Sequence, residues 1–196
     1  MDASPSFASY TPQLMRVATQ VRSLGLVGKK VTLFAPVGSI SGADGLVQKV
    51  ADALSALDRT PILIINVKDV PSDSMATFPP AEESEAGNDH FYINHAEGYA
   101  GNGRESGKPI SHINALAIRS ADTLPVVITR ARGQIGYVFV DAPAVVDSAA
   151  TSLAAAYADA VVLIVQKGTS LQREIEAAKQ QFLALGAHIV GFIFIE

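Results

Sequence analysis

The residues best suited to chemistry lie in a glycine-rich turn between an apolar run and a segment with helical spacing. The apolar run covers residues 30–35, and beyond the turn apolar side chains recur at positions 46, 47, 50, 53, 54 and 57. A turn that leads from a strand into a helix N-terminus aims backbone N–H groups at phosphate. The pattern therefore has the frame of a phosphate-binding turn, and this turn contains Gly38, Ser39, Gly42 and Asp44.

The turn departs from the phosphate-loop signature, in which Lys and then Ser or Thr follow the second glycine. Gly38 and Gly42 stand one residue closer than the signature requires, and Ala43 and Asp44 follow them. A carboxylate at a helix N-terminus is favoured by roughly 0.3–1 kcal/mol, and it repels phosphate. Two interpretations are open at this point: a nucleotide site, or a retained strand–turn–helix scaffold in which Asp44 caps its own helix.

The elements that must position this turn alternate along the chain. Helical spacing begins at Thr11 and ends before Gly25, and the first strand follows. Further strands are predicted at residues 61–67, 137–141, 160–165 and 189–195, and further helices at 43–56, 148–156 and 171–185. Strands that alternate with helices in this way form a parallel sheet with right-handed crossovers. The sequence thus predicts an α/β fold with a mostly parallel central sheet flanked by helices.

Two stretches interrupt this alternation. Residues 69–111 are rich in Pro, Gly, Ser, Asn and acidic side chains, so we expect a long surface loop that is mobile in part. Weak helical periodicity returns at residues 111–120. Residues 122–132 combine a strand-like apolar run with Pro125 in what fits the first turn of a helix, and the proline favours a helix there.

Composition limits the class of protein. The 196 residues are 48% hydrophobic, enough for one sizeable core, and we expect a single domain over residues 1–196. The net charge of −4 gives no reason to expect nucleic-acid binding, and without cysteines the chain has no disulfides. No apolar run reaches the roughly 18 residues of a membrane-spanning helix, and we expect no signal peptide because residues 1–6 lack the basic-then-apolar pattern. We expect a soluble cytoplasmic protein.

Residues 137–148, Tyr-Val-Phe-Val-Asp-Ala-Pro-Ala-Val-Val-Asp-Ser, carry a family resemblance. They resemble the Walker B strand and turn of deviant-Walker P-loop ATPases, more narrowly of the bacterial tyrosine kinases that act in capsule and exopolysaccharide export. The resemblance covers about residues 10–68 and 120–196 and implies a three-layer P-loop NTPase-like fold. It also implies that Asp141 holds a magnesium-bound water, although a carboxylate at this place can equally cap the next turn.

The departures from this family are as informative as the matches. The second strand ends in Asn66-Val67-Lys68 where the family has Asp-x-Asp, and Ala144 replaces the family's second proline. Of the family's carboxylate motifs, Asp141 alone remains. We therefore expect no catalytic residue and no metal ligand, and we interpret Gly38, Ser39, Gly42, Asp44 and Asp141 as the remnant of a nucleotide site.

The combination predicts a pseudo-ATPase or pseudokinase that acts as a regulatory or assembly partner in polysaccharide biosynthesis or export. Its partner would be a membrane polysaccharide-export component, which would recruit it to the inner face of the membrane, or a second copy of the chain. We expect no cofactor, no nucleic acid and no direct membrane insertion. One alternative is an active ATP-binding tyrosine kinase or ATPase that uses ATP and magnesium with nonstandard residues. Another is a positioning- or partitioning-type binding module.

Overall fold

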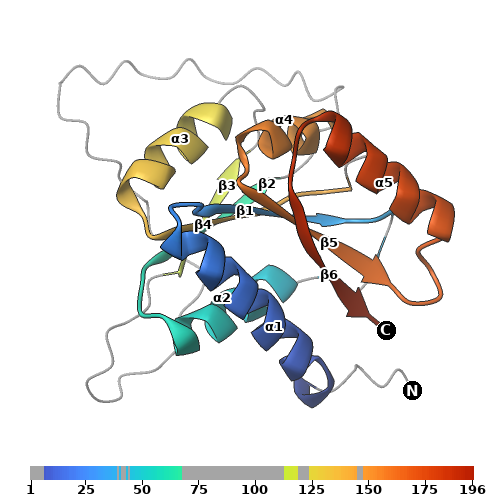
Figure 1. Cartoon of the computed structure of the whole chain (residues 1–196), viewed down its shortest axis with the longest axis horizontal. Coiled ribbons are helices and arrows are strands. Elements are labelled where there is room, and N and C mark those ends of the chain that lie inside the picture. The colour runs from blue at the N-terminus through green and yellow to red at the C-terminus, as the bar shows by residue number, and fades with distance from the viewer. Residues whose placement is uncertain are drawn as a thin grey trace.

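A computed structural model describes residues 7–38, 40, 43, 45–67, 113–118, 124–144 and 148–196. Helices and strands alternate through this part of the chain (Figure 1), as the apolar patterns predicted, except that the strands at residues 62–67 and 113–118 are consecutive described elements. The elements, in order, are α1 (Phe7–Leu26), β1 (Val31–Pro36), α2 (Leu46–Leu57), β2 (Ile62–Val67), β3 (Ile113–Ile118), α3 (Leu124–Gln134), β4 (Tyr137–Asp141), α4 (Ala149–Tyr157), β5 (Ala160–Gln166), α5 (Gln172–Ala184) and β6 (Ile189–Ile195).

Six strands form one sheet in the order β3-β2-β4-β1-β5-β6, and every neighbouring pair is parallel. β1 lies near the middle of the sheet, between β4 and β5. The side chains of residues 31–35 in β1 and 160–165 in β5 are buried, as expected for strands covered on both faces. The predicted α/β class with a parallel central sheet is therefore confirmed.

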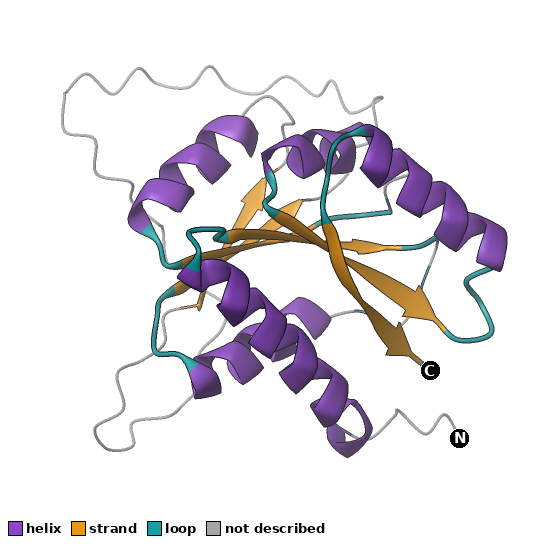
Figure 2. Cartoon of the chain, viewed as in Figure 1, coloured by secondary structure: helices purple, strands orange, loops and turns teal. Residues whose placement is uncertain are grey.

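Helices cover both faces of the sheet (Figure 2), with α1 and α2 on one face and α3, α4 and α5 on the other. Because successive strand residues point to opposite faces, β1 contributes to two apolar cores. Phe34 packs under α1 and α2, where its ring centroid lies 5.0 Å from that of Phe139. Leu33 faces the other way, into the core that contains Phe182 of α5.

The prediction for residues 111–120 was wrong, because the described part of this segment is strand β3. Ile113–Ile118 pairs residue by residue with Ile62–Val67 at an edge of the sheet. A short apolar run fits a helix or a strand equally well from periodicity alone, and here pairing with β2 decides. The prediction of a helix around residues 122–132 is confirmed by α3.

Other expectations from the sequence fall outside the described residues. The loop predicted at residues 69–111 is one of them, and the extent of the domain also stays a prediction. Within the described residues, no helix has the length and apolar character needed to cross a membrane.

Candidate functional site

The candidate site lies at the carboxyl ends of β1 and β4. Asp141 ends β4, and the strand register places it beside Phe34 of β1 and Asn66 of β2. Ligands of open α/β sheets bind outside the carboxyl ends of strands, where neighbouring crossovers leave for opposite faces. β1 and β4 meet this condition, because α2 and α4 lie on opposite faces of the sheet (Figure 2).

The loop after β1 begins with Val37 and Gly38. The backbone N–H of Val37 donates to the carbonyl of Ile164 at 2.8 Å, which extends the pairing of β1 with β5 beyond the strand. Gly38 then turns the chain with φ of 72°, a left-handed conformation that glycine adopts without strain. Of the predicted site residues, the structure thus places Gly38 and Asp141 at the same edge. The other three (Ser39, Gly42 and Asp44) lie outside the described residues.

The start of α2 differs from the helix N-terminus that the sequence predicted. Its N-cap residue is Gly45, with φ of 70° and no side-chain capping bond, whereas the sequence suggested Asp44 in that role. A left-handed cap favours glycine, which explains the shift by one residue. Ala43, at the position of the signature lysine, is half-buried and packs against the apolar cluster beneath α2. A lysine there would have to turn its stem away from this cluster to meet a phosphate.

The turn around Asp141 is held by α4. The N–H of Ala142 donates to the carbonyl of Phe34 at 3.1 Å. Further along, the Thr151 hydroxyl donates to the carbonyl of Pro143 at 2.9 Å, and the Ser148 hydroxyl accepts the Thr151 N–H at 3.2 Å. These bonds fix parts of the backbone that follows the half-buried Asp141. Asp141 itself makes a further interaction within the protein, and its role in magnesium binding stays a prediction.

Sequence reasoning missed two side chains at this edge, Ser170 and Glu174. The Ser170 hydroxyl donates to the carbonyl of Val37 at 3.1 Å. The Glu174 carboxylate accepts the N–H of Leu171 at 3.0 Å, and its Oε2 lies 3.2 Å from where a Cβ on Gly38 would stand. A capping box would require Ser or Thr three residues before the glutamate, and Leu171 holds that position. The sequence therefore offered no signal for either residue.

The charges beside the Gly38 turn bear on phosphoryl transfer. Enzymes of that class neutralise developing phosphate charge with cationic side chains and metal ions. Here Ala43 supplies no charge where the signature has lysine, and Glu174 adds a carboxylate beside the Gly38 turn. In the described ranges, no group of three or more His, Asp or Glu side chains is arranged to hold a metal ion. Whether the turn binds a nucleotide stays a prediction.

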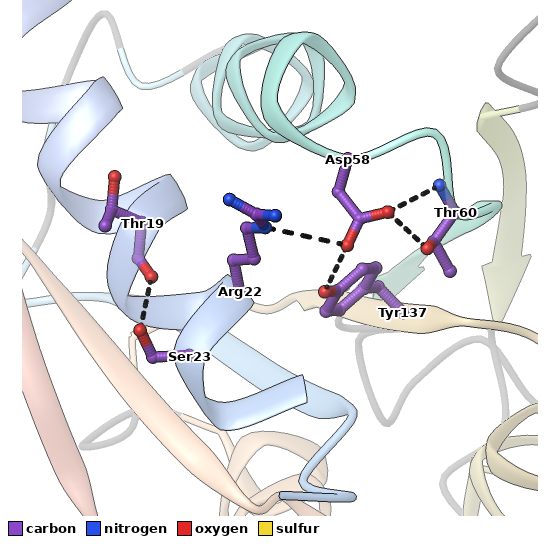
Figure 3. Close-up of polar contacts among 6 residues, drawn as sticks. All are labelled: Thr19, Arg22, Ser23, Asp58, Thr60 and Tyr137. Atoms are coloured by element: carbon purple, nitrogen blue, oxygen red, sulfur yellow. Dashed lines mark hydrogen bonds and ion pairs between the residues drawn. The ribbon is translucent and has the colours of Figure 1, made fainter. Parts of the chain in front are cut away.

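A second polar cluster lies at the opposite, amino edge of the sheet, around Asp58 (Figure 3). Its carboxylate accepts the backbone N–H of Thr60 and the hydroxyl of Tyr137, each at 3.0 Å, and also the Thr60 hydroxyl. The guanidinium of Arg22 lies 3.9 Å away. The bonds from Thr60 hold the pKa of Asp58 below its ordinary value. Burial, helped by the bond to Asp58, raises the pKa of Tyr137 to about 12.

Comparison with known proteins gives a result at the level of fold. No protein-family model and no curated protein matches the chain. Among solved structures, the BceF tyrosine kinase domain is similar with a TM-score of 0.61 and 13% identity, over 94% of this chain and 76% of that one. The VpsO kinase domain gives 0.57 and 12%, over 96% and 98%.

A third structure supports the same conclusion. The kinase domain of the Escherichia coli tyrosine kinase ETK is similar with a TM-score of 0.55 and 12% identity, over 92% of this chain and 74% of that one. The resemblance first noted on residues 137–148 is thus confirmed for the fold. This chain has the α/β fold of bacterial tyrosine kinase domains.

Proposed function

We propose that this protein is a catalytically inactive relative of the exopolysaccharide tyrosine kinases. It keeps their fold and serves as a regulatory or assembly partner in polysaccharide biosynthesis or export. The observation that carries the proposal is Ala43, which stands where phosphate-loop enzymes have lysine and packs against the core beneath α2. Loss of that charge removes an interaction with the β- and γ-phosphates on which phosphoryl transfer depends.

The side chains around the turn support the same proposal. The Glu174 carboxylate lies against Gly38, and Asp44 follows Ala43 in the sequence. Negative charge at a helix N-terminus competes with the anion that such a terminus would otherwise attract. Charge and packing therefore both act against a bound nucleotide.

A partner protein is the second part of the proposal. Fold alone does not fix function, and a regulatory domain must act through a surface. Leu26 and Val27, at the end of α1, are 77% and 71% exposed. A partner that covers these apolar side chains removes their surface from contact with water, which favours association. A membrane export component or a second copy of the chain would fill this role.

The deciding experiment is thermal unfolding of the purified chain with and without MgATP or MgADP. A ligand at 100 times its dissociation constant adds about 2.7 kcal/mol to the free energy of unfolding. We expect no shift at millimolar nucleotide. A magnesium-dependent rise that disappears in Asp141→Ala would overturn the proposal in favour of an active ATPase or kinase with nonstandard residues.

Two variants distinguish the possible causes if nucleotide gives no thermal shift. Ala43→Lys combined with Asp44→Ser restores the missing side chains, and Ala43→Ser with Asp44→Ser is the matched control without the lysine. If the lysine variant alone gains MgATP stabilisation, side-chain loss explains inactivity. If neither responds, the turn has also lost the shape that a phosphate needs.

The partner is tested by sedimentation velocity of the chain alone. Association that Leu26→Ser weakens, while Leu183→Ser on α5 does not, identifies a second copy as the partner. Leu183 is a suitable control because it is 55% exposed on the opposite face of the sheet. A chain that stays monomeric points to the export component, which is then tested by binding to the isolated cytoplasmic segments of that component.

A further inference from the structure

The hydroxyl of Ser170 occupies a place in the sheet that is normally taken by direct backbone pairing. In a parallel ladder, a residue that donates its N–H to one partner accepts from the N–H two positions further along that partner strand. Val37 donates to Ile164 at 2.8 Å, so regular pairing would join its carbonyl to the N–H of Gln166. Instead, the Ser170 hydroxyl accepts from Gln166 at 3.0 Å and donates to Val37 at 3.1 Å.

The turn that carries Ser170 is well fixed. The N–H of Ser170 donates to the carbonyl of Gln166 at 2.9 Å, and the N–H of Lys167 donates to the carbonyl of Ile195 on β6 at 2.8 Å. Ser170 is half-buried, so its hydroxyl bonds are partly shielded from water. The hydroxyl thus links the end of β1 to a turn that is itself anchored on β5 and β6.

Glu174 adds a second contact four residues later. Its Oε2 accepts the N–H of Leu171 at 3.0 Å, which holds the carboxylate over the first turn of α5. The same oxygen lies 3.2 Å from the Cβ position of Gly38, closer than most neighbours of a real Cβ. Any side chain or bound group on that side of Gly38 must displace the carboxylate.

We propose that Ser170, in the turn before α5, and Glu174, in the first turn of α5, form a latch that sets the conformation of Val37 and Gly38 at the end of β1. Ser170 is a positioning residue whose hydroxyl replaces one backbone hydrogen bond between the end of β1 and β5. Glu174 fills the space beside the Gly38 turn. This latch does not depend on whether the protein binds nucleotide. It couples the Val37–Gly38 turn to the start of α5, so that a shift of either one displaces the other.

Amide hydrogen exchange of the nucleotide-free chain tests the latch. We expect Ser170→Ala to raise exchange roughly fivefold, the effect of one net hydrogen bond, in peptides covering residues 34–46 and 163–171. Ser170→Thr keeps the hydroxyl and should exchange as the wild type does. Glu176→Gln, an exposed change on the same helix, is the matched control and should alter neither peptide.

The two contacts are separated by Glu174 variants. Glu174→Ala should raise exchange in residues 34–46, whereas Glu174→Gln preserves the shape and should change it less. The proposal is overturned if Ser170→Ala leaves both peptides unchanged. It is equally overturned if exchange in Ile62–Val67 rises by the same factor, because the hydroxyl would then contribute to global stability alone. Should Ser170→Ala fail to fold, Ser170→Cys, with its weaker donor, is measured and read in the same way.

Discussion

The two edges of the sheet are held together by different chemistry. At the amino edge, the carboxylates of Asp58 and Asp159 join segments that are distant in the sequence. Asp159 accepts the backbone N–H groups of Lys30 and Val31, both at 2.9 Å, and lies 3.3 Å from the guanidinium of Arg132. At the carboxyl edge, by contrast, hydroxyl groups make the bonds: Ser170 bonds to the distant Val37, and Thr151 bonds to the nearby Pro143.

This difference separates structural acids from candidate functional ones. Hydrogen bonds to a charged group contribute about 1.5–3 kcal/mol, about twice the value for neutral pairs. Asp58 and Asp159 each accept several such bonds, so their contribution to the stability of the fold is enough to explain their presence. The carboxyl edge is joined by weaker neutral bonds, and its acids, Asp141 and Glu174, lie where a ligand of this fold would bind. The amino edge should thus dominate stability and tolerate little change.

The largest expected effect is that of Gly25→Ala at the amino edge. A Cβ on Gly25 would lie 2.4 Å from Cε1 of Tyr137 and 2.7 Å from its hydroxyl oxygen. The ring is buried and bonded to Asp58, so it cannot move aside cheaply. We expect a loss of about 3 kcal/mol in the free energy of unfolding, measured by urea denaturation.

Gly133→Ala is the matched control for that change. Gly133 lies in α3 with nothing within 4 Å of its Cβ position, so alanine should be neutral or stabilise the helix by up to about 1 kcal/mol. Equal losses in the two variants would mean that the contact between Gly25 and Tyr137 is not the cause.

The next effect concerns alkaline pH and Tyr137. Because its pKa is raised to about 12 in the folded chain, from an ordinary value of 10.0, folding favours the protonated phenol. The corresponding stability is complete below pH 10 and is lost as the pH rises toward 12. Two pKa units correspond to about 2.5 kcal/mol. Urea unfolding across this range should show a steeper fall for the wild type than for Tyr137→Phe, and parallel curves would contradict the assignment.

Much of this fold could be predicted from the sequence because its strands are buried on both faces. Continuous apolar runs, such as residues 160–165, signal such strands without any knowledge of their neighbours. β3 was missed because a six-residue segment with five apolar residues and one asparagine fits a helix or a strand, and pairing with β2 determines which one forms. A local sequence pattern predicts an element when the residues of that element determine its conformation. It fails when pairing with a distant strand determines whether the segment forms a helix or a strand.

The candidate site divides in the same way. Gly38 and Asp141 could be found from the sequence, because a turn after a strand and a carboxylate at a strand end are local patterns. Ser170 could not, since its partner Val37 is 133 residues away in the sequence. Glu174 approaches Gly38 through the packing of α5 against the sheet, and no spacing along the chain records that approach.

A smaller loss is expected from Asp159→Ala, which tests whether the amino edge depends on its carboxylates. The variant leaves the N–H groups of Lys30 and Val31 without their acceptor and removes the ion pair with Arg132. We expect destabilisation by about 2 kcal/mol, because charge-assisted bonds to two backbone donors disappear. Asp159→Asn keeps one acceptor oxygen and should lose about half as much. An Asp159→Ala variant as stable as the wild type would remove the distinction between the edges.

The smallest effect that still discriminates is Ser148→Ala at the carboxyl edge. Ser148 is the N-cap residue of α4, and its hydroxyl accepts the N–H of Thr151. Replacing such a cap with alanine costs about 1 kcal/mol. Ser152→Ala, one turn further along the same helix, is the control and should cost less. Because the cap is a neutral bond, Ser148→Ala should lower the free energy of unfolding by less than Asp159→Ala does when both are measured by urea unfolding.

A decrease as large as that of Asp159→Ala would mean that the capping bond of Ser148 contributes as much to stability as the carboxylates of the amino edge. The carboxyl edge would then have to be regarded as structural rather than functional.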